Sequence, residues 1–185
     1  MEPLPAQLTL DQFVLEMGRV PVRELTHERF VDLVDRLRVA DELLDARTHF
    51  LDRDYARNLV LRTPHFELLV LCWLPGHAST IHDHAGSLNA IRVRSGELTS
   101  RVFRPAAGAE PGAGPVELTS EDRVGPADPL VGVDRGGIHQ LGNTSDARLV
   151  TVHVYAPPLL ELNVYDTAAP AVQKLPLRRS YVEDL

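Results

Sequence analysis

Cysteine is nearly absent from this sequence, since Cys72 is the single one among 185 residues. A chain with one cysteine forms no intrachain disulfide, which excludes the disulfide-rich folds of small secreted proteins. Long apolar runs are also missing: the longest, residues 68–74, is far shorter than the roughly 20 residues that cross a bilayer. Residues 1–10 have neither the basic nor the apolar part of a signal peptide. We therefore expect a cytoplasmic protein with no membrane partner.

Runs of basic residues are equally scarce. The net charge is -7, and no stretch holds four consecutive Lys or Arg residues; the densest basic pair is Arg178-Arg179. Binding to a phosphate backbone needs many Lys and Arg side chains, so the sequence argues against a nucleic-acid partner. Small anionic ligands remain compatible with this charge, because one buried arginine is enough to hold them.

The length and composition are those of a single globular domain, 1–185, with 44% apolar and 24% charged residues. Residues 1–50 read as a helical N-terminal arm that packs outside the rest of the chain. Thr9 is a candidate N-cap for a helix over 10–17 that ends at Gly18, and Thr26 begins a second helix. The apolar residues of this second helix recur at the spacing of one helical face. A third short helix is expected over 40–46.

From about residue 55 the apolar pattern changes to a period of two, which indicates strands. Many short strands separated by turns favour a mainly β fold, a sandwich or barrel over 51–165, followed by a C-terminal tail over 166–185. Ser95-Gly96 is predicted to form a two-residue hairpin turn. The expected strands are 55–62, 66–73, 79–82, 88–94, 97–104, 116–119, 130–133, 138–141, 148–155, 162–165 and 171–174, the last two as short edge strands.

His82 and His84 stand one residue apart in a predicted strand, so both imidazoles project to the same face. Two neutral imidazoles side by side form half of a site for Fe, Zn, Cu or Ni. By itself, a histidine pair of this kind is more simply a pair of polar surface residues. The frame around the pair changes that interpretation: Gly76 precedes it, Asn89 and Gly96 follow, and Gly136, His139 and Asn143 come later with a third histidine.

These two spaced segments resemble the two motifs of the cupin family. The resemblance implies a jelly-roll-like barrel in which His82, His84 and His139 bind one metal ion. Two positions depart from the family pattern: Asn89 stands where cupins usually carry Glu, and Asp134 stands where they usually carry Pro. Three neutral histidines leave a divalent ion its full charge, which favours anionic ligands such as a thiolate. The three ligands also leave open positions for a substrate and O2.

Two further groups of residues are spaced two apart in predicted strands, so the side chains within each group project to the same face. Thr151, His153 and Tyr155 can form a hydrogen-bond relay in which His153 orients the phenol, although Tyr155 can equally be an ordinary core aromatic. Tyr55 and Arg57 stand two residues apart, and the planar fork of an arginine matches a carboxylate. The simpler alternative for Arg57 is a surface position.

The segments 55–59, 71–84, 137–139 and 151–158 together resemble the thiol dioxygenase branch of the cupins, and within it the cysteine dioxygenase family. The resemblance implies that Fe(II) is held by the three histidines and that a bound thiol is oxidised to the sulfinate with both atoms of O2. By the same resemblance, Arg57 binds the substrate carboxylate with help from Tyr55. Thr151, His153 and Tyr155 match the family's relay, with Thr in place of Ser. The bond from Ala156 to Pro157 is expected to be cis.

Two departures concern the substrate pocket. Asn89 stands where animal enzymes have a cysteine cross-linked to the tyrosine at Tyr155, so no cross-link is expected here. Leu88 stands where they have a histidine, and we assign both positions to substrate binding. Arg57 favours L-cysteine over 3-mercaptopropionate, because the related branch for that substrate carries Gln. We therefore expect a monomeric cysteine dioxygenase; the alternatives are a dioxygenase of another small mercapto acid such as 3-mercaptopropionate, or a non-catalytic metal-binding cupin.

Overall fold

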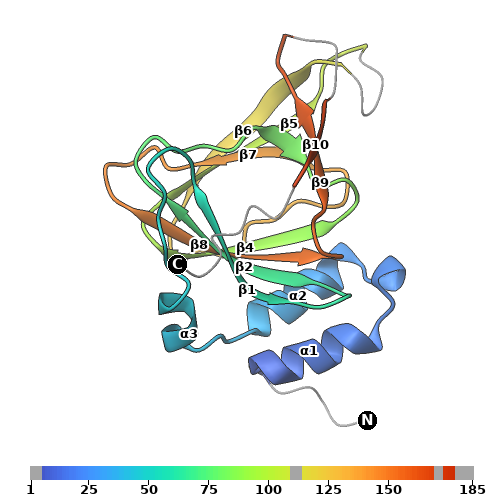
Figure 1. Ribbon diagram of the computed structural model, residues 1–185. Coiled ribbons are helices and arrows are strands. Elements are labelled where there is room, and N and C mark those ends of the chain that lie inside the picture. Colours follow the sequence, from blue (N-terminus) through green and yellow to red (C-terminus); the bar gives the residue numbers. More distant parts are fainter. Residues whose placement is uncertain (1–5, 109–113, 169–172, 178–185) are drawn as a thin grey trace.

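Two antiparallel β-sheets face each other in the computed structural model, and three helices lie below the lower sheet (Figure 1). The structure describes residues 6–108, 114–168 and 173–177. The mainly β fold with helices outside the barrel is therefore confirmed. Among the described residues, no helix is long and apolar enough to cross a membrane.

The N-terminal arm folds into helices largely where the sequence predicts them. Thr9 and Thr26 cap the first two α-helices, each accepting a hydrogen bond from a backbone N–H in the first turn. The first helix continues through Gly18, so the predicted stop there is wrong; a short 3-10 turn, which the sequence did not predict, follows it. The helices are α1 (Leu10–Arg19), η1 (Val22–Glu24), α2 (His27–Arg36) and α3 (Asp41–Asp45).

The strands cover most of the segments with a two-residue period. They are β1 (Ala56–Arg62), β2 (Glu67–Trp73), β3 (Ile81–Asp83), β4 (Leu88–Ser95), β5 (Leu98–Pro105), β6 (Val116–Val124), β7 (Ile138–Gly142), β8 (Leu149–Ala156), β9 (Glu161–Tyr165) and β10 (Gln173–Pro176). The four-stranded sheet has the order β1-β2-β8-β4, and the six-stranded sheet has the order β10-β9-β3-β7-β5-β6. Strand β9 therefore lies inside its sheet and is not the predicted edge strand. The first two residues of the predicted strand 171–174 lie outside the described residues.

The turn at Ser95-Gly96 is not a hairpin. Strand β4 pairs with β8, whereas β5 pairs with β6 and β7, so the turn carries the chain from one sheet to the other. Gly96 has φ +83, and a Cβ there would lie 2.5 Å from the carbonyl oxygen of Arg148. Glycine is needed at this crossing for both reasons. The predicted strand 130–133 is also wrong, because Val131 forms only an isolated bridge to Ile91.

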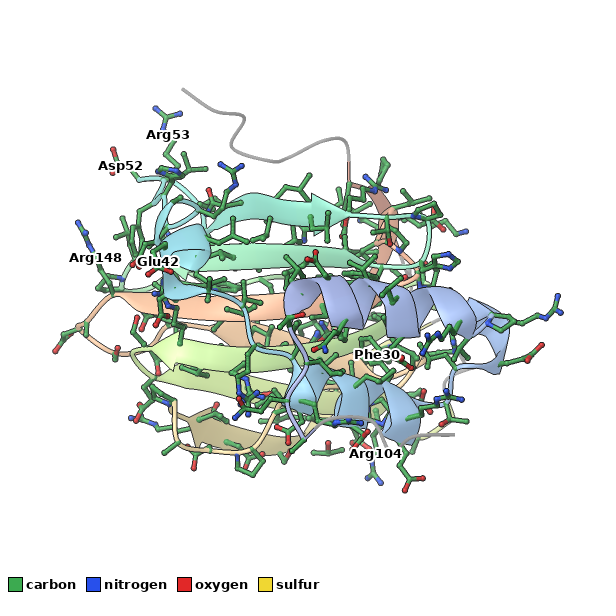
Figure 2. All side chains as sticks on the ribbon, turned by 90° about the horizontal axis from the view of Figure 1, so that it is seen from below. Phe30, Glu42, Asp52, Arg53, Arg104 and Arg148 are labelled. Carbon is green, nitrogen blue, oxygen red and sulfur yellow. The ribbon has the colours of Figure 1, made fainter. Side chains whose placement is uncertain are left out.

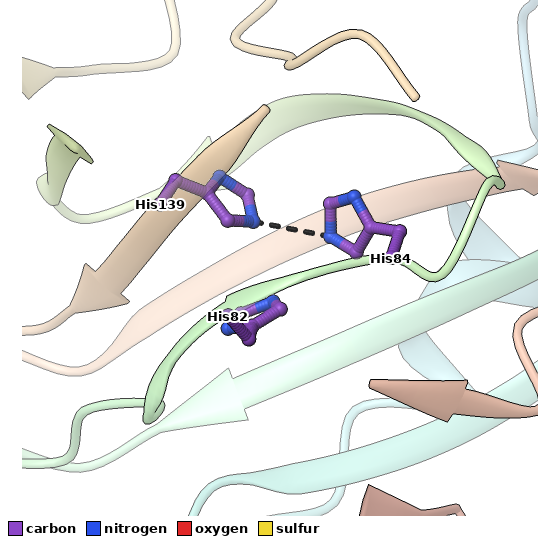
Figure 3. A group of neighbouring side chains, drawn as sticks. All are labelled: His82, His84 and His139. Atoms are coloured by element: carbon purple, nitrogen blue, oxygen red, sulfur yellow. Dashed lines mark hydrogen bonds between the residues drawn. The ribbon is translucent and has the colours of Figure 1, made fainter. Parts of the chain in front are cut away.

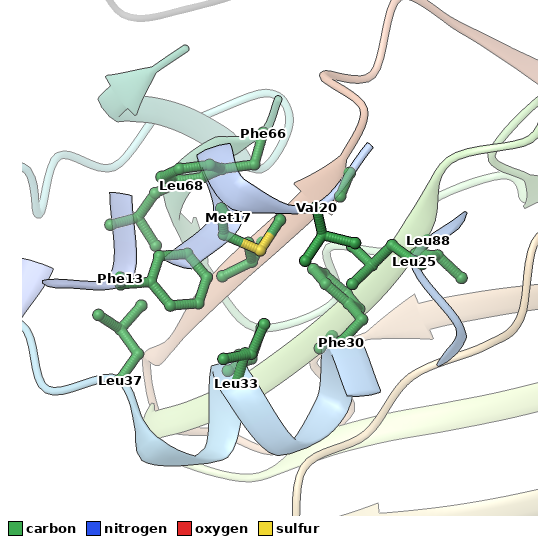
Figure 4. Close-up of a cluster of buried hydrophobic side chains, with 14 of the residues drawn as sticks. Phe13, Met17, Val20, Leu25, Phe30, Leu33, Leu37, Phe66, Leu68 and Leu88 are labelled. Carbon is green, nitrogen blue, oxygen red and sulfur yellow. The ribbon is translucent and has the colours of Figure 1, made fainter. Parts of the chain in front are cut away.

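An apolar core joins the helices to the outer face of the four-stranded sheet. Viewed from below, α1 and α2 lie side by side across that face, and Phe30 points inward from α2 (Figure 2). Phe13 of α1 packs edge-on against Phe66, with ring centroids 5.0 Å apart. Leu88 of β4 belongs to the same buried cluster (Figure 4). The helices therefore cover the sheet on the side away from the barrel interior.

Candidate metal centre and substrate cavity

Three histidines meet between the two sheets. His82 on β3 is the cross-strand partner of His139 on β7, and His84 follows β3 directly. Their ring centroids are 4.7 to 5.1 Å apart, and one ring nitrogen from each residue lies within 4.8 Å of the other two (Figure 3). All three side chains are buried. The predicted ligands are thus brought together in a group that could hold a metal ion.

Burial keeps these imidazoles uncharged. It lowers the pKa of His82 to about 4 and holds the pKa of His84 and of His139 well below the usual range. The charges of neighbouring histidines lower the last two pKa values further. Neutral rings have a free lone pair on one nitrogen, which is the form in which histidine binds metals.

The hydrogen bonds of the rings fit a metal ion. Nδ1 of His82 lies 2.9 Å from the carbonyl oxygen of Thr80, to which it donates, so its Nε2 keeps the lone pair. Nε2 of His84 lies 3.1 Å from Nε2 of His139, and Nδ1 of neither ring has a hydrogen-bond partner among the described residues. A cation would satisfy lone pairs on both facing nitrogens. Imidazole donors suit Fe, Zn, Cu and Ni.

Asp83 points away from this group, as its place between the two histidines predicts. Its carboxylate accepts hydrogen bonds from the hydroxyl of Tyr165 at 2.5 Å, from Nδ2 of Asn163 at 2.8 Å and from the backbone N–H of Ala85 at 2.7 Å. Asp83 therefore ties β3 to the neighbouring strand β9 and fixes the turn after His84.

The predicted relay is present as a chain of contacts on β8. Oγ1 of Thr151 lies 2.8 Å from Nε2 of His153, and Nδ1 of His153 lies 3.1 Å from the hydroxyl of Tyr155. The Tyr155 ring also packs against His84, with centroids 5.3 Å apart. The sequence did not identify Trp73, whose indole N–H donates to Oγ1 of Thr151 at 2.9 Å. A buried tryptophan needs an acceptor for this N–H, which is the signal that points to such a contact.

Arg57 lies in the interior, so its alternative assignment as a surface residue is wrong. Its guanidinium approaches the Tyr155 ring at 5.9 Å and pairs with Glu67, with 3.6 Å between Nη2 and Oε1. Glu67 is fully buried and was not predicted, although a carboxylate beside a long apolar run is an unusual residue. Tyr55 stacks on Trp73 with ring centroids 4.2 Å apart.

Leu88 and Asn89, which the resemblance assigns to substrate binding, lie on opposite faces of β4. Asn89 pairs with Tyr155 across the strands and is buried, and its Oδ1 has no hydrogen-bond partner among the described residues. Leu88 faces the other way, into the core beneath the helices. The assignment of Leu88 to the substrate pocket is therefore wrong, because side chains alternate along a strand and only Asn89 faces the interior.

A cavity of about 10 Å³ lies between the sheets and is lined by Tyr55, Arg57, His82, His153 and Tyr155, among others. That volume holds about one water molecule. A larger cavity of about 420 Å³ lies on the outer side of the four-stranded sheet, beside the segment that joins α2 to α3. None of the three histidines or the relay residues lines it, so the small cavity is the candidate substrate site.

The facing sheets with a three-histidine group between them define a cupin barrel with a candidate metal site. The chain belongs to the cysteine dioxygenase type I family, whose model matches residues 27–168. It is 31% identical over 117 residues to cysteine dioxygenase type 1 of Danio rerio, a match that covers 60% of this chain and 56% of the relative. The Homo sapiens protein of the same name is 32% identical over 116 residues, with the same coverage. The match thus spans little more than half the length of these relatives.

Solved structures support the fold alone. An uncharacterised Klebsiella pneumoniae protein with a double-stranded β-helix domain superposes with a TM-score of 0.52 at 20% identity, covering 66% of this chain and 88% of that one. The structure of the TT1209 protein from Thermus thermophilus gives a TM-score of 0.50 at 22% identity, covering 62% of this chain and 94% of that one. The double-stranded β-helix is the barrel that the sequence predicted.

Proposed function

We propose that this protein is an Fe(II)-dependent thiol dioxygenase that oxidises L-cysteine to cysteine sulfinate. The thiol and one O2 molecule give the sulfinic acid, so both oxygen atoms enter the product and the reaction needs no further reductant. Membership of the cysteine dioxygenase type I family supports the reaction class. The main support for L-cysteine as the substrate is Arg57, which is buried and lines the same cavity as His82 and Tyr155.

His82, His84 and His139 would hold the iron. Bound Fe(II) supplies the electron exchange with O2 that a thiol alone lacks. Imidazole ligands bring no negative charge, and burial disfavours the protonated, positively charged form of all three rings. An iron ion held by these residues would keep its full charge toward the substrate, which would favour the thiolate over the thiol.

Arg57 would bind the substrate carboxylate, and Tyr55 would support it. Nε of Arg57 is buried and has no hydrogen-bond partner among the described residues, so a donor is available for a ligand. Glu67 pairs with Nη2 of the same guanidinium at 3.6 Å. Because the cavity has the volume of about one water molecule, a mercapto acid enters only if side chains around it move.

Tyr155 would act as a proton donor beside the substrate. Burial is the main cause that raises its pKa, against the opposing charge of Arg57, so the phenol keeps its proton at neutral pH. Asn89 would lie near the amine end of the substrate through its partnerless Oδ1. An asparagine forms no thioether, so Tyr155 acts here without a cross-link.

The first test is O2 uptake by the Fe(II)-loaded chain, with mass spectrometry of the products in 18O2. L-cysteine, 3-mercaptopropionate, cysteamine and a larger mercapto acid form the panel. We expect cysteine sulfinate carrying two labelled atoms, with one O2 consumed for each thiol. Turnover of only another thiol would refute cysteine as the substrate. No sulfinate from any thiol, with iron bound, would refute the dioxygenase itself.

Arg57→Gln tests how the substrate is held. The variant should raise KM for L-cysteine far more than KM for cysteamine, which has no carboxylate. Arg92→Gln is the matched control, because Arg92 pairs with Asp35 on the outer side of the barrel. Equal effects of Arg57→Gln on both thiols would contradict carboxylate binding at this residue.

We further propose that the protein is a cytoplasmic monomer. Cys72 is buried and has a raised pKa, which suits a structural thiol that needs no oxidising compartment. Light scattering of the purified chain and fractionation of cells test the two statements, and a stable dimer or a secreted protein would contradict them.

A further inference from the structure

The relay on β8 has a defined hydrogen-bond direction that begins outside the predicted residues, at Trp73. An indole N–H only donates, so Oγ1 of Thr151, 2.9 Å away, must accept this bond. Thr151 is fully buried, and its hydroxyl proton has one possible acceptor among the described residues, which is Nε2 of His153 at 2.8 Å. A buried donor without an acceptor is costly, so Thr151 donates to His153.

This donation places the proton of His153 on the opposite nitrogen. The ring is fully buried, which keeps it neutral with a single N–H. Because Nε2 accepts from Thr151, the N–H is at Nδ1 and donates to the hydroxyl oxygen of Tyr155 at 3.1 Å. Tyr155 then uses its oxygen as the acceptor toward His153, and its own proton is free to point into the cavity that it lines.

We propose that Trp73 is a positioning residue that, through Thr151, fixes His153 as the Nδ1–H tautomer and so turns Tyr155 into a hydrogen-bond donor toward the substrate cavity. This inference rests on the proposed function for its consequence in turnover, but its structural part stands without any reaction. Trp73 also stacks on Tyr55 at 4.2 Å, so one side chain contacts both the relay and the carboxylate-binding pair. Cooperative polarisation along such a chain strengthens each bond in it.

The tautomer is measured directly by 15N NMR of the full chain with labelled histidine, in the metal-free form and with diamagnetic Zn(II). We expect His153 to be protonated at Nδ1 and to accept a hydrogen bond at Nε2. Thr151→Val identifies the signal, since it removes the hydroxyl while keeping the shape of the side chain. Thr151→Ser, which retains a hydroxyl, should keep the wild-type tautomer. A wild-type His153 protonated at Nε2 would overturn the proposal.

Kinetics then test whether Trp73 acts through Tyr155. Trp73→Phe keeps an aromatic ring on Tyr55 but removes the N–H, and Thr151→Val breaks the next link. Thr151→Val should lower kcat about tenfold with KM for L-cysteine little changed, since Thr151 does not line the cavity. In a Tyr155→Phe background, neither change should reduce kcat further. Losses of kcat that multiply fully with Tyr155→Phe would overturn the proposal and assign Trp73 a packing role.

Failure of the proposed reaction and failure of the role proposed for Trp73 give different results. If no thiol is turned over but His153 carries its proton at Nδ1, the proposed reaction is wrong and the tautomer assignment holds. If cysteine is turned over but the proton is at Nε2, the reaction holds and the role of Trp73 is refuted. Far-UV circular dichroism of each variant confirms that the barrel has folded before either result is used.

Discussion

Replacing Glu67 by Gln removes the negative charge from the buried pair with Arg57, and also from the longer pair with Arg62, whose Nε lies 3.9 Å from Oε2. The two side chains have almost the same shape, and the amide oxygen can still accept the bond that the backbone N–H of Leu159 donates at 3.2 Å. The side chain of Glu67 is 0% exposed and that of Arg57 is 7% exposed. The substitution therefore leaves a guanidinium in the interior without its carboxylate.

The size of the effect follows from the separation of 3.6 Å between Nη2 and Oε1. Coulomb's law at an effective dielectric constant of about 20 gives an attraction of about 5 kcal/mol. Breaking a buried pair by removing one partner costs about 3–5 kcal/mol, because the remaining charge is left unpaired. Arg57 borders the cavity and gains some hydration there, so we expect a loss of about 3 kcal/mol in the free energy of unfolding.

Urea denaturation of the metal-free chain at neutral pH measures this loss, as a lower midpoint with an unchanged slope. Glu121→Gln is the matched control. Glu121 pairs with Arg101 at 2.5 Å, but the two side chains are 43% and 29% exposed, so we expect its loss to be below about 1 kcal/mol. If Glu67→Gln lowers the midpoint no more than the control does, the buried charge pair does not stabilise the barrel and the reasoning is wrong.

Three further predictions concern residues around the candidate metal centre and in the core. Tyr165→Phe removes the hydroxyl that donates to Asp83 and should lower the free energy of unfolding by about 1–3 kcal/mol. An unchanged urea midpoint would show that this hydrogen bond between β9 and β3 does not stabilise the barrel. Cys72, whose pKa burial raises to about 12, should react with a thiol reagent at pH 8 only after unfolding, and rapid labelling of the native chain would show that it is accessible. Because burial depresses the pKa of His82 to about 4, the stability it contributes is complete above pH 6.5 and is lost as the pH falls toward 4. Urea midpoints of the metal-free chain that stay constant over this range would refute the neutral, buried ring.

Local patterns in the sequence correctly predicted which side chains share one face of a strand, because this depends only on period and spacing. The separation of His82 from His84 placed both rings on one face, and the same period aligned Thr151, His153 and Tyr155, whose contacts the structure contains. These predictions succeed because the direction of a side chain on a strand depends only on its parity.

What the sequence did not reveal depends on which strands become neighbours. Trp73 reaches Thr151 across 78 positions of the chain, through a β2–β8 pairing that no local pattern encodes. The hairpin predicted at Ser95-Gly96 is wrong for the same reason. Two alternating runs around a glycine have the same pattern whether the second strand pairs with the first or joins the opposite sheet. The prediction for Leu88 is wrong because a family position does not specify the face of β4, and Leu88 faces the helices.

The candidate site is divided between the two sheets. The three histidines belong to the six-stranded sheet or to the turn that follows β3, whereas Arg57, Trp73, Glu67 and the relay all stand on the four-stranded sheet. If the proposed function holds, changes on the four-stranded sheet away from Tyr155, whose ring packs on His84, would alter the preference for one thiol over another while leaving the three histidines in place. A search for altered specificity should accordingly diversify the inward positions of β1, β2, β4 and β8, and leave β3 and β7 as they are.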